Sequence, residues 1–174
     1  MRFEHGAIRE APIIAKRARA HPDESPQVFT RGMGAAPPRV GGRPRIVVAR
    51  SLDELKEHRL ALDDLAADSL ERNVFYESIL AEPAVRSFGA DRRLELVFVY
   101  RDDPGAPQRP PRLVGFFPFE RPGRYRGLPV TALVSFKHRH CFLGTPLVRR
   151  EGAGRTVGAV FDWLSGESGS ALVE

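Results

Sequence analysis

The segment LELVFVY at residues 94–100 limits the folds open to this chain more than any other feature. It is apolar on both alternating faces except at Glu95, and a strand of this kind needs cover on both sides. The turn-rich stretch DDPGAPQRPP at 102–111 follows it and is typical of a hairpin loop, after which residues 113–119 return as the next strand. The pattern predicts interior strands of a sheet with helices on both faces.

One strand and two helical stretches are predicted before this hairpin. IVVA at 46–49 is typical of a short buried strand, and the capping-box pattern S-x-x-E opens a predicted helix at 51–70. A second helical stretch is expected at 75–88, with Gly89 as its C-cap. Pro83 either interrupts this stretch or restarts it as a first-turn proline.

The rest of the chain adds strands and one further helix. Pro118 cannot donate a hydrogen bond to a neighbouring strand, which predicts a bulge or a sheet edge at that position. Further elements are predicted as strands at 128–136 and 141–144, a helix after Gly154 that ends at Gly166, and a strand at 171–173. The fold class is therefore α/β, with a mixed, mostly antiparallel sheet flanked by helices. A strand that opens where the sequence stops indicates an incomplete domain at 46–174.

Positive charge is concentrated at the start of the chain. Residues 1–45 hold nine Arg or Lys against four acids, whereas residues 46–174 hold eighteen of each sign. A neutral folded part argues against a nucleic-acid-binding protein. The Pro-, Gly-, Ala- and Arg-rich first 45 residues are predicted to be a disordered leader. One interpretation is a disordered leader or an over-extended gene start, with Met33 as a candidate start residue. The other is a basic tether that binds an acidic partner.

The cysteine content and the length of the apolar runs indicate where in the cell the protein is located. Cys141 is the single cysteine, so no disulfide can form within the chain and a reducing, cytoplasmic location is expected. The longest apolar runs are far below the roughly 20 residues that a membrane-spanning helix needs, so no membrane span is predicted.

The element order and several segments resemble the GNAT superfamily of N-acyltransferases, and within it the CelD-like branch associated with polysaccharide and cellulose biosynthesis. The segments that carry the resemblance are SLDEL at 51–55, NVFYESIL at 73–80, RSFG at 86–89, LVGFFPFE at 113–120 and LGTPLV at 143–148. The resemblance covers about residues 46–174. It implies a GNAT-like partial fold and the first half of a protein whose C-terminal half is a second GNAT-like unit.

The resemblance also implies a function. Such a protein moves an acetyl or other acyl group from acyl-CoA, its cosubstrate, to an amine of a sugar or small-molecule acceptor, and it needs no metal. The second half generally holds the better acyl-CoA site. An alternative from a different class is a non-catalytic GNAT-like module that shapes the acceptor site or binds a partner.

A glycine-containing turn is the candidate site for acyl-CoA. GNAT enzymes hold the pyrophosphate on a Q/R-x-x-G-x-G/A turn that opens a helix, where backbone amides and the helix N-terminus face the phosphates. Arg149, Arg150, Gly152 and Gly154 fit this pattern and lie between the predicted sheet and a helix. An ordinary glycine-rich turn before a helix is the alternative interpretation.

Acyl transfer to an amine needs a base for the ammonium proton and an acid for the departing thiolate. Glu77 and Glu120 are the candidate bases because each lies in apolar sequence, where burial would raise the pKa of a carboxyl group. Tyr125 is the candidate acid. Surface carboxylates and a tyrosine that packs its ring are the plainer alternatives for all three residues.

Candidate acceptor-binding residues lie near these carboxylates and in the segment HRHC at 138–141. Asn73, Phe75 and Tyr76 precede Glu77, and His138 with His140 would share one face of an extended segment. Cys141 would then point to the opposite face, which argues against a zinc site or a Cys/His nucleophile. The two histidines are instead expected to line a substrate groove.

Overall fold

The computed structural model describes residues 44–103, 105–166 and 172–173. The elements run β1 (Arg45–Ala49), α1 (Leu52–Glu57), α2 (Arg59–Ala67), the 3-10 helix η1 (Val74–Tyr76), α3 (Ser78–Phe88), β2 (Leu94–Arg101), β3 (Arg112–Glu120), β4 (Ala132–Ser135), β5 (Leu147–Val148), α4 (Ala153–Gly166) and β6 (Leu172–Val173). The predicted α/β class is confirmed. The predicted leader lies outside the described residues except for 44 and 45, and β1 begins one residue earlier than expected.

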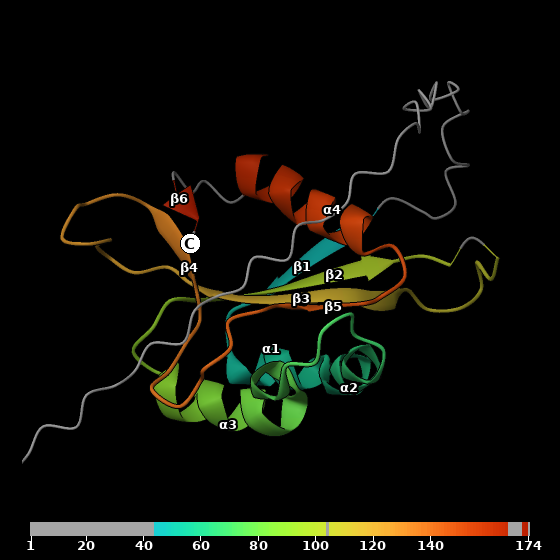
Figure 1. The fold of residues 1–174 in the computed structure, drawn as a ribbon, viewed down its shortest axis with the longest axis horizontal. Coiled ribbons are helices and arrows are strands. Elements are labelled where there is room, and N and C mark those ends of the chain that lie inside the picture. The colour runs from blue at the N-terminus through green and yellow to red at the C-terminus, as the bar shows by residue number, and fades with distance from the viewer. Residues whose placement is uncertain (1–43, 104, 167–171, 174) are drawn as a thin grey trace, which may run out of the picture. The chain divides into compact units, whose positions relative to one another are not determined.

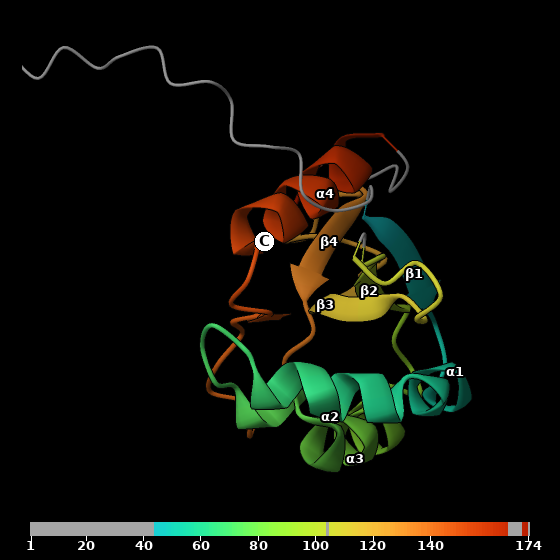
Figure 2. The ribbon, with the colours of Figure 1, turned by 90° about the vertical axis from the view of Figure 1, so that its right-hand side faces the viewer.

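The strands form one mixed sheet in the order β1-β2-β3-β4-β6, with β5 also paired to β3. All of these pairs are antiparallel except β4 with β6, which is parallel, as predicted for a mostly antiparallel sheet. Helices α1, α2 and α3 cover one face, and α4 covers the other (Figures 1 and 2). The sheet is therefore the middle of three layers.

Side chains of β2 divide the core into two clusters. Leu96 and Phe98 pack with residues of α1, α2 and α3, whereas Val97 and Val99 pack with residues of α4. All four are fully buried. Alternation along a strand sends successive side chains to opposite faces. The prediction from LELVFVY is confirmed, and Glu95, its one charged residue, forms a bidentate ion pair with Arg121 at 2.8 and 3.0 Å.

A bulge in β3 positions the start of α4. Val99 pairs with Gly115 but Tyr100 pairs with Leu113, so Val114 is the extra residue. A Cβ atom added to Gly115 would lie 2.6 Å from the Thr156 methyl of α4. The bulge and the bare glycine thus let the first turns of α4 sit directly on β3.

The predicted bulge at Pro118 is wrong, because Pro118 pairs in regular register with Leu96 and β3 is an interior strand. The Pro118 carbonyl accepts a hydrogen bond from the Phe136 amide at 2.9 Å, so its nitrogen also faces the β4 side. There β3 changes partner, from β5 at Phe116 to β4 at Phe119. The missing N–H therefore falls between two pairing stretches.

Two details of the predicted helices differ from expectation. The helix predicted at 51–70 is two helices, because His58 leaves helical geometry and its ring contacts β2, with Nδ1 2.8 Å from the Tyr100 hydroxyl. α3 continues through Pro83, which is exposed. Gly89 is the C-cap as predicted, and its amide donates a hydrogen bond to the Val85 carbonyl at 2.9 Å. No helix in the described ranges is long and apolar enough to cross a bilayer.

A loop of residues 136–146 separates β4 from β5, although both pair along the same edge of β3. The predicted strand at 141–144 is wrong, because this stretch lies within the loop and has no strand geometry. Phe136 and Cys141 join the core cluster beneath α1 and α3. The loop therefore leaves the sheet edge, packs against the helical layer and returns.

The cap of α1 provides a stability prediction. Ser51 Oγ accepts a hydrogen bond from the Glu54 amide at 3.2 Å, and the Glu54 carboxylate accepts one from the Arg50 amide at 2.9 Å. Ser51→Ala is expected to lower the free energy of unfolding by about 1 kcal/mol, measured by urea denaturation. Ser87→Ala, at an exposed position inside α3, is the control and should not lower stability. Equal losses in both variants would contradict the capping role.

Candidate functional site

The turn before α4 leaves backbone open at the start of a long helix. Gly152 has φ +74°, a left-handed conformation that glycine adopts without strain, and its carbonyl accepts hydrogen bonds from the amides of Arg155 and Thr156. A Cβ atom added to Gly154 would meet nothing within 4 Å. The first amides of a helix have no partner within the helix, so this turn can receive an anion.

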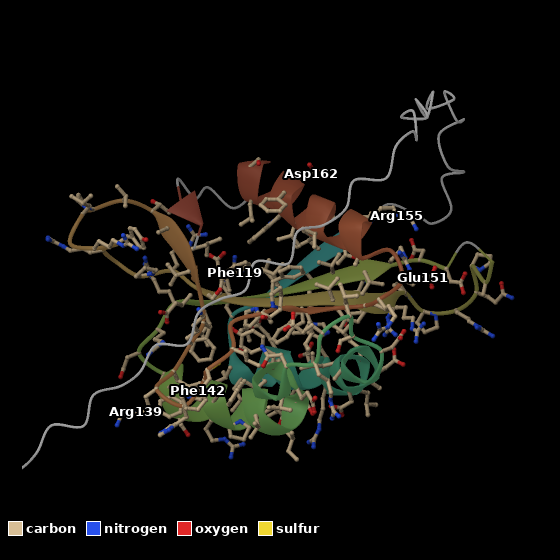
Figure 3. The ribbon with its side chains drawn as sticks, viewed as in Figure 1. Phe119, Arg139, Phe142, Glu151, Arg155 and Asp162 are labelled. Carbon is tan, nitrogen blue, oxygen red and sulfur yellow. The ribbon has the colours of Figure 1, made fainter. Side chains whose placement is uncertain are left out.

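Arg101, at the end of β2, lies against this turn. A side chain at residue 152 would collide with its Nη1. That nitrogen is buried and has no hydrogen-bond partner among the described residues, while Nη2 lies 3.8 Å from the Glu151 carboxylate. Nothing in the sequence pattern marks Arg101 except its position as the last residue of a strand. Figure 3 shows Glu151 and Arg155 together at this end of the molecule.

Arg149 occupies the interior rather than the turn. Its side chain is fully buried, with Nη1 2.8 Å from Asp68 and Nη2 2.5 Å from Asp64, both near the end of α2. Its Nε donates to the Leu113 carbonyl at 3.1 Å. Each guanidinium nitrogen therefore has a partner within the protein, so Arg149 joins α2 to the sheet and does not face a ligand at Gly152.

Arg150 and Glu77 line one hollow of about 630 Å³ beside the end of α2. Arg150 donates to the Ser69 carbonyl at 3.1 Å, and Glu77 is 19% exposed and 3.3 Å from Arg72 Nε. The structure thus brings together one predicted phosphate-binding residue and one predicted base. Glu77 directly precedes α3, which places its carboxylate at the edge of the helical layer.

Asn73 and Tyr76 hold the 136–146 loop. Asn73 is fully buried and donates to the carbonyls of Leu143 and Thr145 at 3.3 and 2.7 Å. The Tyr76 hydroxyl donates to the Phe136 carbonyl at 3.0 Å, and burial raises the pKa of Tyr76 above its usual value. Phe75 is half-buried and meets the exposed Phe142 ring edge to face. The Asn73 amide nitrogen and the Tyr76 hydroxyl therefore hold the loop in place.

The two histidines lie in the first half of this loop. His138 stacks on Phe88 with ring centroids 4.7 Å apart, and His140 lies 6.2 Å from His138. The segment is a turn rather than extended, since the Cys141 amide donates to the His138 carbonyl at 2.8 Å. Burial lowers the pKa of His138 and raises that of Cys141. Within the described ranges, no three His, Cys, Asp or Glu side chains gather to hold a metal ion.

Glu120 and Tyr125 share a second hollow of about 400 Å³, beneath the β3–β4 hairpin. Glu120 forms an ion pair with Arg92 at 2.8 Å. The predicted catalytic residues are thus divided between two hollows, since Glu77 lines the one at α2.

Comparison with known proteins adds no relative. No protein-family model, no curated protein and no solved structure matches this chain.

Proposed function

We propose that this chain is part of an acyl-CoA-dependent N-acyltransferase of the GNAT type, in the CelD-like branch. It would transfer an acetyl or other acyl group to an amine of a sugar or small-molecule acceptor, together with a C-terminal half. The observation that carries the proposal is the open turn at Gly152, which begins α4 and lies against an arginine with an unpartnered buried nitrogen.

This turn suits a pyrophosphate group for electrostatic reasons. Helix amides and the positive end of the α4 dipole stabilise negative charge at this point. The guanidinium of Arg101 can donate to phosphate oxygens, and a charge-assisted hydrogen bond would satisfy its Nη1. Arg150 and Arg155 flank Gly152 in sequence and add positive charge. Glu151 opposes them, but its carboxylate is exposed and close to Arg101.

The same geometry favours Glu77 as the base. Glu77 lines a hollow with Arg150, which is two residues before Gly152 in the chain, and an acceptor bound in this hollow would face the Glu77 carboxylate. The acceptor ammonium would lose a proton to Glu77 through water, and the amine nitrogen would attack the thioester carbonyl carbon. The carbon–sulfur bond would then break and release the CoA thiolate, which takes up a proton. Glu120 and Tyr125 remain candidates for proton transfer at the hairpin hollow.

A non-catalytic GNAT-like module is the second candidate, and the position of Arg149 favours it. The first cation of the R-x-x-G-x-G pattern is fully buried in ion pairs with Asp64 and Asp68, so this chain would bind phosphate with fewer cations. In that case the chain would shape the acceptor site for the C-terminal half. Acyl transfer by this chain alone would exclude this candidate.

Titration of CoA into the full chain tests the proposed site. Gly152→Val would strain a left-handed position and displace Arg101, and Arg101→Gln would remove the charge without changing the turn. We expect each variant to weaken CoA binding at least tenfold, since one charge-assisted contact contributes about 1.5–3 kcal/mol. Isothermal titration calorimetry measures the change, and thermal unfolding shows whether each variant is folded.

Arg109→Gln is the matched control, because Arg109 is an exposed arginine in the loop between β2 and β3. It should bind CoA as the wild type does. Pantetheine, which lacks the pyrophosphate, should bind wild type and Arg101→Gln equally. The proposed site would be contradicted if the wild type bound no CoA. It would also be contradicted if a folded Arg101→Gln variant bound CoA with the affinity of the wild type.

A further inference from the structure

The connection between β3 and β4 ends in a tight, projecting hairpin. Tyr125 and Leu128 exchange backbone hydrogen bonds at 3.0 and 2.9 Å, and Arg126 and Gly127 between them have φ of 48° and 84°. These are the dihedrals of a type I′ turn, which matches the twist of paired strands. Figure 1 shows the hairpin, in orange, extending beyond the ends of β1 and β2. Its turn is therefore a pre-shaped part of the surface.

Arg126 is an unusual residue for this turn. Left-handed backbone favours Gly, Asn or Asp, and a non-glycine residue with positive φ is uncommon. Among the described non-glycine residues, Arg126 alone has positive φ. A charged side chain kept in a strained position on an exposed tip is a reason to look for a function there.

The tip combines positive charge with exposed aliphatic side chains. Arg124 and Arg126 line a hollow at the hairpin together with Glu120, which pairs with Arg92 at 2.8 Å. On the same hairpin, Leu128 is 60% exposed and Val130 is 37% exposed. Exposing these two apolar side chains to water is unfavourable, so the pair suits a medium that is apolar beneath an anionic surface.

We propose that the hairpin of residues 121–131 binds the surface of an anionic lipid bilayer. Arg124 and Arg126 would contact headgroup phosphates and carboxylates, while Leu128 and Val130 would enter the boundary with the acyl chains. Tyr125, whose ring lies 5.2 Å from the Arg126 guanidinium, belongs to the residue type that favours this boundary. This binding goes beyond the proposed acyl transfer and does not depend on it.

The residues favour a bilayer over nucleic acid. Nucleic-acid binding uses a track of cations together with base stacking or hydrogen bonds to base edges, to which Leu128 and Val130 contribute nothing. Arg124 and Arg126 lie at the turn of one hairpin, beside these two exposed aliphatic side chains. A bilayer uses both kinds of side chain at once.

The test is sedimentation of the full chain with phosphatidylcholine vesicles, with and without phosphatidylserine. Arg124→Gln/Arg126→Asn removes two charges, and Asn suits the left-handed position, so the turn is preserved. We expect the double variant to lose at least tenfold in partitioning to anionic vesicles, since each basic residue contributes about fivefold. Leu128→Ser should lose severalfold in the same vesicles.

Arg86→Gln/Arg109→Gln is the matched control, because it removes two exposed arginines from other elements and leaves the first 45 residues unchanged. It should partition as the wild type does. Equal losses in the two double variants would overturn the proposal, as would equal binding to vesicles without phosphatidylserine. Binding to a DNA duplex that is weakened by Arg124→Gln/Arg126→Asn, with no vesicle binding, would assign the tip to nucleic acid. CoA titration of the hairpin variants should be unchanged, so the two proposals fail separately.

Discussion

Phe116→Ala is expected to lower the free energy of unfolding by about 4 kcal/mol, because it removes a large side chain from the centre of the core. Phe116 is 1% exposed. Its ring stacks on Phe98 at 4.8 Å and meets Tyr76 edge to face at 6.2 Å, so it links the two central strands to the helical layer. Urea denaturation followed by circular dichroism measures the loss. A typical domain is stable by only 5–15 kcal/mol, so part of the variant is expected to be unfolded at 37 °C.

Phe142→Ala is the matched control for this variant. Phe142 is 83% exposed, and Figure 3 shows it at the end of the molecule next to α3. Its replacement should change stability by no more than about 0.5 kcal/mol. A loss of similar size in both variants would contradict the placement of Phe116 in the core.

Arg149→Ala is expected to lower the free energy of unfolding by about 3 kcal/mol. The substitution leaves a cavity and removes the side-chain hydrogen bond that Arg149 donates to the carbonyl of buried Leu113. Asp64 and Asp68 are 53% and 47% exposed, so water can partly replace their lost partner, and the loss falls at the lower end of the range for a broken buried pair. Guanidinium denaturation at two pH values measures it.

Arg112→Gln provides the control, because Arg112 also binds Asp64 but from an exposed position, and it should cost no more than about 1 kcal/mol. Arg112 and Arg149 hold the pKa of Asp64 below its usual value of 3.8. A carboxyl group with a lowered folded pKa adds stability above that value and loses it as the pH falls through the folded pKa. The difference in free energy of unfolding between wild type and Arg149→Ala should therefore become smaller in strong acid. A difference that does not depend on pH would assign the effect to packing alone.

Much of the fold follows from local pattern. The apolar faces of residues 94–100, the S-x-x-E cap and the glycine at 89 each predict their own element, and the structure has each of them. The break at His58 and the bulge at Val114 were not predictable in this way. Both are set by contacts between segments far apart in the chain, the first with Tyr100 and the second with α4.

The candidate site was predicted less completely than the fold. The glycine turn does open a helix, but the pattern does not reveal that Arg149 pairs with α2, because Asp64 and Asp68 lie more than 80 positions away. Asn73 and Tyr76, the predicted acceptor contacts, donate hydrogen bonds to a loop, which the sequence did not indicate. Arg101 was not expected at all. A side chain's partners across a fold depend on three-dimensional packing, which residue spacing does not encode.

The 136–146 loop has a consequence for how proteins of this architecture can diversify. β4 and β5 follow the same edge of β3 and the loop between them is held at Phe136 and Thr145, so its exposed middle, around Arg139 and Phe142, can change without moving either strand. Lengthening a surface loop costs little free energy, because closure entropy grows only slowly with length. Related chains can therefore differ in the sequence and length of this segment, and so in the side chains presented beside α3, while the sheet and helices stay the same.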